Sequence, residues 1–190
     1  PMSDYQILQD ISNEEGLPVR IQFYVSDGEE ALEFIDNGPF FDDQHMLTAR
    51  GVKLYADGAI GSRGAAFFEK YDDYDTKGFI IFQKEETMPK LIKALVNGIQ
   101  IQTHAIGDLA ISITLDWYEE AFNSVSDANR MIIEPRWRIE HSQNILPKDQ
   151  QRFADMQVIA SMQPSHAIGD LHFAHKRLGI DRLTNAYTWR

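Results

Sequence analysis

Residues 97–108 read Asn-Gly-Ile-Gln-Ile-Gln-Thr-His-Ala-Ile-Gly-Asp, and they decide how the rest of the chain is interpreted. Positions 99, 101 and 103 are apolar or β-branched and alternate with glutamines, which is the period of a β-strand. His104 comes where this alternation stops, and a glycine-containing turn then leads into a helical pattern from Leu109. Proteins built from βα units place catalytic groups at such strand ends. The alternative is a histidine that only completes the strand.

The rest of the sequence repeats this arrangement of strand and helix. Alternating patterns predict four more strands, at residues 19–25, 52–56, 136–141 and 157–163. Amphipathic patterns predict helices at residues 4–15, 29–36, 85–96, 109–125 and 147–156, and residues 65–78 form a long excursion. Strands that alternate with helices, without an obvious hairpin signal, predict a parallel α/β sheet that is either barrel or doubly wound.

Length and composition exclude several classes of protein. The 190 residues suffice for one domain, and the net charge of −11 argues against nucleic acid or an anionic membrane surface as a partner. The chain has no cysteine, which excludes disulfide scaffolds, Cys-ligated zinc and thiol nucleophiles and fits a cytoplasmic protein. No apolar run reaches the roughly 18 residues that span a membrane, and the first residues do not resemble a signal peptide.

The five residues His-Ala-Ile-Gly-Asp occur twice, at 104–108 and at 166–170. Both copies follow a predicted strand, but the residues around them do not match. We therefore interpret the repetition as coincidence or as a weak echo of a βα unit, and not as a repeat array.

Four predicted strand ends carry polar side chains that could take part in chemistry. They are Lys53 with Asp57, His104, Glu140 with His141, and His166. Parallel strands present their carboxyl ends at one edge of a sheet, so these residues can converge although they are far apart in sequence. Neutral imidazoles are common ligands of divalent metals, and His104 and His141 are therefore a candidate metal pair. The alternative is two unrelated histidines at strand ends.

Lys53 lies inside an otherwise apolar strand, where a charged ammonium is costly to bury. It could be a carbamate that bridges two metal ions, a Schiff-base nucleophile, or the partner of an acid such as Glu140. The fourth alternative is an edge-facing lysine whose ammonium reaches water. The strand pattern alone does not choose among these four roles.

The turn after residues 52–56, Asp57-Gly-Ala-Ile-Gly-Ser-Arg63, has neither the lysine of a Walker loop nor the spacing of a dinucleotide fingerprint. We expect it to approach a substrate closely, with Arg63 facing an anionic or polar group or forming a surface ion pair. The remaining histidines lie in polar segments and are expected to be solvated: His45, His172 and His175. The aromatic side chains of the excursion are expected to pack it: Phe67, Phe68, Tyr71 and Tyr74.

Four stretches carry a resemblance: Val52-Lys-Leu-Tyr-Ala-Asp-Gly-Ala-Ile-Gly-Ser-Arg63, Thr103-His-Ala-Ile-Gly-Asp108, Arg138-Ile-Glu-His-Ser-Gln143 and Ile159-Ala-Ser-Met-Gln-Pro-Ser-His166. Together they resemble successive motifs of the metal-dependent amidohydrolase family 3, the YtcJ-like group that is akin to N-substituted formamide deformylases. The residues that also fit are Asp170, Lys176-Arg-Leu-Gly179 and Ala186-Tyr-Thr-Trp-Arg190. The resemblance covers residues 51–190, and residues 1–50 fit more loosely.

This resemblance implies a TIM-type (β/α)8 barrel with an added β-sandwich and one or two divalent metal ions, often zinc. The superfamily holds its metals with a His-x-His on the first strand, a Lys or Glu on the fourth, histidines on the fifth and sixth, and an Asp on the eighth. Lys53, carbamylated or not, would then be the fourth-strand ligand, with His104 and His141 as the fifth-strand and sixth-strand ligands. The substrate side would be formed by Asp57, Arg63 and His166.

The sequence departs from the family pattern in two places. It contains no His-x-His and no eighth-strand motif with the general-base Asp, so no catalytic residue is assigned with certainty. The predicted strands correspond to strands three to seven. We therefore expect residues 1–190 to be the central part of a partial TIM barrel, without its first strands, its eighth strand and its β-sandwich. Open sheet edges would favour association between copies.

We consider three functions. In the first, the parent protein hydrolyses a C–N bond of a small amide-type substrate with metal-activated water, while this part alone is inactive. In the second, the protein is a metal-free barrel lyase that uses Lys53 as a Schiff-base amine. In the third, the chain is a structural or interaction fragment without activity. The sequence identifies neither the substrate, nor the metal, nor the oligomeric state.

Overall fold

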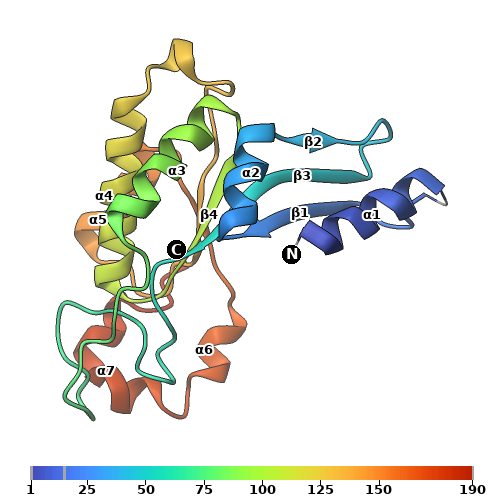
Figure 1. The fold of residues 1–190 in the computed structure, drawn as a ribbon. Helices are drawn as coiled ribbons and strands as arrows, with labels where there is room; N and C mark the ends of the chain where they lie inside the picture. Colours follow the sequence, from blue (N-terminus) through green and yellow to red (C-terminus); the bar gives the residue numbers. More distant parts are fainter. Residues whose placement is uncertain (1, 15, 190) are drawn as a thin grey trace.

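The computed structural model describes residues 2–14 and 16–189. Five strands of its sheet run parallel in the order β1, β3, β4, β5 and β6 (Figure 1). Their bounds are Ile21–Ser26 for β1, Leu47–Tyr55 for β3, Gln100–Ala105 for β4, Arg138–His141 for β5 and Ile159–Ser161 for β6. The predicted parallel α/β sheet is therefore confirmed, and every strand joins the neighbour that follows it in sequence among these five.

The predicted helices are confirmed within one or two residues at each described end. Their bounds are Met2–Glu14 for α1, Glu29–Asn37 for α2, Lys84–Val96 for α3, Asp108–Ser124 for α4 and Pro147–Asp155 for α5. The predicted end of the first helix at Glu15 lies outside the described residues. Two short helices that the sequence pattern did not predict follow β6, namely α6 at Ser165–Gly169 and α7 at Ala174–Arg182. Two 3₁₀ turns occupy Asp127–Asn129 and Leu183–Asn185.

The sheet also contains an antiparallel pair for which the sequence pattern showed no obvious hairpin signal. The short strand β2, Phe40–Phe41, pairs antiparallel with the first half of β3. Strand β3 also begins five residues before the predicted start, at Leu47 rather than Val52. A two-residue strand shows no alternation, and Thr-Ala-Arg-Gly is weak in strand-forming residues, so neither feature had a sequence signal.

The two faces of the sheet differ in chemistry. Buried side chains of the strands, such as Val52, Ile101 and Ile139, join the apolar core together with Leu91 of α3 and Ile111 of α4. Helices α3, α4 and α5 lie side by side along this face (Figure 1). The opposite face carries half-buried polar side chains: Lys53, Gln100, Gln102, His104 and Arg138. A doubly wound sheet would bury apolar side chains on both faces, so the arrangement is that of a partial TIM barrel.

A second, smaller core lies beyond the carboxyl ends of β3 and β4. It joins the excursion after β3 to α7 through buried apolar side chains: Ile60, Ala65, Phe67, Tyr71, Ile106 and Leu178. Helices α6 and α7 and this excursion lie at the same end of the sheet (Figure 1). The expected packing role of Phe67 and Tyr71 is thereby confirmed, and their rings meet edge to face at 5.3 Å between centroids. Phe68 and Tyr74, in contrast, are exposed.

Close backbone packing holds the excursion against the turn after β4. A Cβ atom added at Gly107 would lie 2.0 Å from the carbonyl oxygen of Ala66. Only glycine fits at such a distance. The backbone of the excursion therefore packs directly against the turn that follows His104 and restricts the position of this turn.

None of the described helices is long and apolar enough to cross a membrane.

Candidate active site

The strand register brings the predicted site residues to one end of the sheet. Tyr55 of β3 pairs with His104 of β4, and Ala105 pairs with His141 of β5. The imidazole rings of His104 and His141 lie 4.6 Å apart between centroids, and the ring of His166 lies 5.3 Å from that of His141. The structure therefore brings three histidines together, and it makes His104 and His141 a facing pair.

A hollow of about 320 Å³ opens beside these histidines. Its polar lining comes from His104, His141, His166, Gln143 and Asp170. Its apolar lining comes from the turn after β3, the turn after β4 and the segment before α7: Ala59, Ile60, Gly61, Ile106 and Phe173. A small pocket with an apolar wall and a few convergent polar groups is the usual form of a small-molecule site.

His141 is presented by a sharp end of strand β5. His141 and the next residue, Ser142, both have positive φ, of 72° and 43°. The Ser142 hydroxyl donates to the carbonyl of Ile139 at 2.9 Å and so stabilises this turn. Left-handed backbone at two non-glycine residues is strained and is concentrated at functional sites in proteins. Burial lowers the pKa of His141, against a hydrogen bond to Gln163 that raises it, so the ring is neutral near neutral pH.

His104 is held by oxygen atoms only. Its Nε2 lies 3.2 Å from the carbonyl oxygen of Gly58 and 3.4 Å from Oδ1 of Asp57. Both oxygens are acceptors, so Nε2 carries hydrogen and donates it to the Gly58 carbonyl, and in the neutral ring the lone pair lies on Nδ1.

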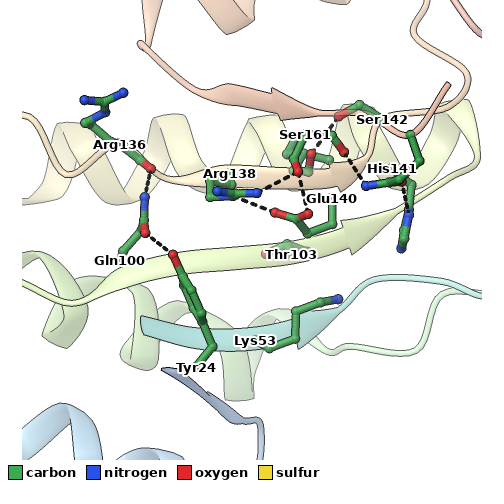
Figure 2. A network of polar contacts seen from close by, with 12 residues as sticks. Tyr24, Lys53, Gln100, Thr103, Arg136, Arg138, Glu140, His141, Ser142 and Ser161 are labelled. Carbon is green, nitrogen blue, oxygen red and sulfur yellow. Dashed lines mark hydrogen bonds and ion pairs between the residues drawn. The ribbon is translucent and has the colours of Figure 1, made fainter. Parts of the chain in front are cut away.

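The ammonium of Lys53 lies on the polar face of the sheet, at 4.2 Å above the ring of Tyr55 and 3.5 Å from the carbonyl oxygen of Leu54. Figure 2 shows its side chain reaching toward the end of the sheet where His141 lies. Burial lowers the pKa of Lys53 to about 8, and the negative charge of Glu140 opposes this shift. A lysine with this pKa keeps a fraction of reactive neutral amine near neutral pH.

Glu140, one of the partners considered for Lys53, is engaged elsewhere (Figure 2). Its carboxylate accepts from Arg138 Nε at 2.7 Å and from the Ser161 hydroxyl at 2.6 Å. Arg138 also donates to Ser161 at 2.7 Å. This partly buried triangle ties β5 to β6, and the charge of Glu140 acts on Lys53 only through space.

Asp57 is enclosed rather than open to the hollow, with 1% of its surface exposed. Its carboxylate accepts from three backbone amides, at 2.9 Å from Ala66, 3.0 Å from Ile106 and 2.8 Å from Gly107. The placement favours a positioning role, in which Asp57 holds the turn after His104 against the excursion.

Arg63 forms the ion pair that was one of its two expected roles. Its guanidinium binds Asp73 with two hydrogen bonds, at 3.0 and 2.9 Å. Arg177 of α7 contacts the same carboxylate, so the excursion is tied to α7. Arg63 is therefore directed to a partner within the excursion and does not line the hollow.

The other histidines lie on the surface, as expected. His45, His172 and His175 are exposed. His166, in contrast, lines the hollow from α6 and faces His141, which fits its predicted place beside the candidate metal pair.

Two residues of the site had no predicted role. Oε1 of Gln163 lies 2.7 Å from Nδ1 of His141, and Gln143 donates at 2.5 Å to Asp170. A glutamine in a sequence does not by itself indicate a catalytic or metal-binding site. The only sequence signal was position. Gln143 follows β5, which ends at His141, and Gln163 follows β6, which pairs with β5.

The donor set fits a divalent cation in part. Two imidazoles on adjacent strands lie 4.6 Å apart between ring centroids, Lys53 lies on the same face of the sheet, and no cysteine competes. Within residues 2–14 and 16–189, however, no group of three or more His, Asp or Glu side chains gathers closely enough to hold a metal ion. The described residues therefore offer a half-site, and further ligands would have to come from elsewhere.

Comparison with known proteins gives consistent matches. The sequence model of the Amidohydrolase family matches residues 2–190. The Arabidopsis thaliana protein LONG AFTER FAR-RED 3 is 36% identical over 133 residues, which cover 70% of this chain and 22% of that protein. The Bacillus subtilis protein named "Putative amidohydrolase YtcJ" is 31% identical over 140 residues, which cover 73% of this chain and 25% of that protein.

Two crystal structures share the fold, and each is described as an uncharacterized metal-dependent hydrolase. The one from Pyrococcus furiosus has a TM-score of 0.82 at 29% identity and covers 96% of this chain and 36% of its own. The one from Pyrococcus horikoshii has a TM-score of 0.82 at 28% identity and covers 96% of this chain and 35% of its own. The chain thus spans about a quarter of the curated relatives and about a third of the solved structures.

Proposed function

Because the chain belongs to the amidohydrolase family, we propose that it is the central part of a metal-dependent hydrolase that cleaves C–N bonds of small amide-type substrates. One observation carries this proposal, namely the facing pair of His104 and His141 beside a hollow of about 320 Å³. The two structural relatives are described as metal-dependent hydrolases, which supports the proposal.

In this proposal His104 and His141 hold a divalent cation, with zinc as our first choice, and Lys53 is a third ligand as amine or carbamate. When bound, such an ion supplies a Lewis acid and a water of lowered pKa. Whether one ion or two are held depends on ligands outside the chain. The pKa of Lys53, lowered by burial to about 8, supports its conversion to a carbamate near neutral pH.

The remaining residues of the hollow bind and orient the substrate. Ile60, Ile106 and Phe173 offer an apolar wall to the non-reacting part of a small molecule. His166 faces the hollow beside His141 and can donate or accept a hydrogen bond. The carboxylate of Asp170 is held by Gln143 at 2.5 Å and by the Tyr187 hydroxyl at 2.8 Å. We propose that the general base comes from outside residues 1–190, so this chain alone is inactive.

The lowered pKa of Lys53 favours a second candidate, a metal-free lyase in which the neutral amine forms a Schiff base with a carbonyl substrate. Borohydride reduction in the presence of a carbonyl substrate separates the two candidates. Covalent trapping at Lys53 would support the lyase, whereas a metal ligand should not be trapped. A non-catalytic structural role is the third candidate. It would be supported if the protein neither hydrolyses an amide-type substrate nor is trapped by borohydride.

The decisive experiment uses the longer protein that contains this chain. The protein is stripped with a chelator, reloaded with zinc, and assayed against a panel of amides, formamides and cyclic imides. The proposal predicts hydrolysis that is lost on stripping, returns with metal, and fails to return in a His104→Ala/His141→Ala variant. A metal-loaded protein that hydrolyses none of these substrates would sink the proposal.

A further inference from the structure

The side-chain amide of Gln163, just beyond β6, has only one orientation that satisfies its contacts. Its Nε2 lies 3.3 Å from the carbonyl oxygen of Ser161, and its Oε1 lies 2.7 Å from Nδ1 of His141. A backbone carbonyl can only accept, so the amide nitrogen has to face Ser161. The amide oxygen therefore faces the imidazole ring.

This orientation determines where the proton of His141 lies. An amide oxygen accepts and cannot donate, so Nδ1 of the ring must carry the hydrogen. A neutral imidazole has one N–H, which leaves the lone pair on Nε2. That lone pair is the atom with which His141 can bind a divalent cation.

His104 has the opposite tautomer on the neighbouring strand. Its Nε2 donates to the carbonyl oxygen of Gly58 at 3.2 Å and lies 3.4 Å from the Asp57 carboxylate, so in the neutral ring Nδ1 has the lone pair. The two rings also differ in what fixes them. His104 donates to a backbone carbonyl beside a buried carboxylate, whereas Gln163 is the only hydrogen-bond partner of the His141 ring among the described residues.

We propose that Gln163 is a positioning residue that fixes His141 as the Nδ1–H tautomer and thereby presents Nε2 to the cation. This role rests on the proposed function, since it specifies how one candidate ligand is prepared. Without an acceptor at Nδ1, the proton can move to Nε2 and occupy the lone pair that a metal needs. Mutation of a residue that hydrogen-bonds to a metal ligand typically lowers metal affinity by about 10- to 100-fold.

The tautomer is measured directly on the metal-free 190-residue chain. Histidine labelled with ¹⁵N reports by NMR which ring nitrogen carries hydrogen, and His141→Gln and His104→Gln variants assign the two signals. The wild-type chain should show Nδ1–H at His141 and Nε2–H at His104. Gln163→Leu should shift His141 toward Nε2–H and leave His104 unchanged as an internal control. Gln163→Glu keeps an acceptor oxygen and should keep the Nδ1–H form.

Zinc calorimetry on the same proteins gives a second readout. Gln163→Leu should weaken zinc binding by about 10- to 100-fold. Gln151→Leu on the exposed face of α5 is the matched surface control and should bind zinc as the wild-type chain does. If Gln163→Leu fails to fold by circular dichroism, Gln163→Met replaces it, because its side chain is similar in length and lacks a strong acceptor.

Two results would overturn the assignment: a wild-type His141 protonated on Nε2, or an unchanged Nδ1–H signal in the folded Leu or Met variant. The outcome is separate from that of the proposed function. A wild-type chain with Nδ1–H at His141 that binds no zinc supports the role of Gln163 and counts against the metal site. Zinc binding by a chain with Nε2–H at His141 counts against the role of Gln163 and supports the metal site.

Discussion

The two His-Ala-Ile-Gly-Asp copies have the same letters and different structures. In residues 104–108 the histidine ends strand β4 and the Asp begins helix α4. In residues 166–170 the first four letters lie inside the short helix α6 after β6. Both copies bring a histidine to the same hollow. The repetition is therefore no repeated βα unit, and the sequence interpretation as coincidence or a weak echo is consistent with it.

The difference between the copies is set by what surrounds them. Ile106 of the first copy is 5% exposed and packs under the excursion, whereas Ile168 of the second is 76% exposed. A Cβ at Gly107 would lie 2.0 Å from the Ala66 carbonyl oxygen, whereas one at Gly169 would meet nothing within 4 Å. The Asp57 carboxylate also holds two amides of the first copy. The surroundings, and not the five letters, make the first copy a rigid part of the site.

The largest contrast is expected between Gly107→Ala and Gly169→Ala. The first change drives a methyl group into the Ala66 backbone and displaces the Gly107 amide from Asp57, so the free energy of unfolding should fall by about 4 kcal/mol. The second replaces a helical glycine in open space and should change stability by less than about 1 kcal/mol, in the stabilising direction. Urea unfolding followed by circular dichroism measures both. Equal losses of unfolding free energy in the two variants would contradict the view that the surroundings distinguish the two copies.

The isoleucines give the next contrast. Ile106→Ala removes a buried side chain from the smaller core and should cost about 3 kcal/mol of unfolding free energy. Ile168→Ala removes an exposed side chain and should stay within about 0.5 kcal/mol of the wild-type chain. The same urea titration checks this pair. A cost at Ile168 similar to that at Ile106 would mean that α6 is buried against something in solution.

The smallest effect is expected at the acid of the first copy, through its pH dependence. Burial raises the pKa of Asp108, against hydrogen bonds from the Phe68 and Leu109 amides. A raised folded pKa means that the folded chain holds the proton more tightly than the unfolded chain, so this group favours folding as pH falls. Asp108→Asn should equal or slightly exceed wild-type stability at about pH 7 and lose that advantage at about pH 3. An advantage that grows on acidification would contradict the burial.

The strands around the site could be predicted because their periodicity is local. Alternation before His104 and before His141 places both histidines at strand ends, and the rules for parallel sheets then bring them together. The hairpin of β2 could not be predicted in this way, because Phe40–Phe41 is too short to show a period. The periodicity alone left barrel and doubly wound sheet open; the family resemblance implied the barrel, and the half-buried polar face of the sheet agrees with it.

The side-chain contacts that support the site could not be predicted from the sequence, for a different reason. Asp57 meets amides 49 and 50 residues further on, and Gln163 meets a histidine 22 residues before it. Such contacts depend on how loops fold over the sheet, and loops carry no periodic signal. The pairing of Arg63 with Asp73 was open for the same reason, since the excursion between them has no regular structure.

The most direct measurement is a zinc titration by calorimetry of the wild-type chain, the His104→Ala/His141→Ala double variant and His166→Ala, with His45→Ala as a surface control. The account predicts binding to the wild-type chain, loss of binding in the double variant, and binding close to wild type in the His166 and His45 variants. Equal binding by the wild-type chain and the double variant, or no binding by either, would contradict a half-site built from the ends of β4 and β5.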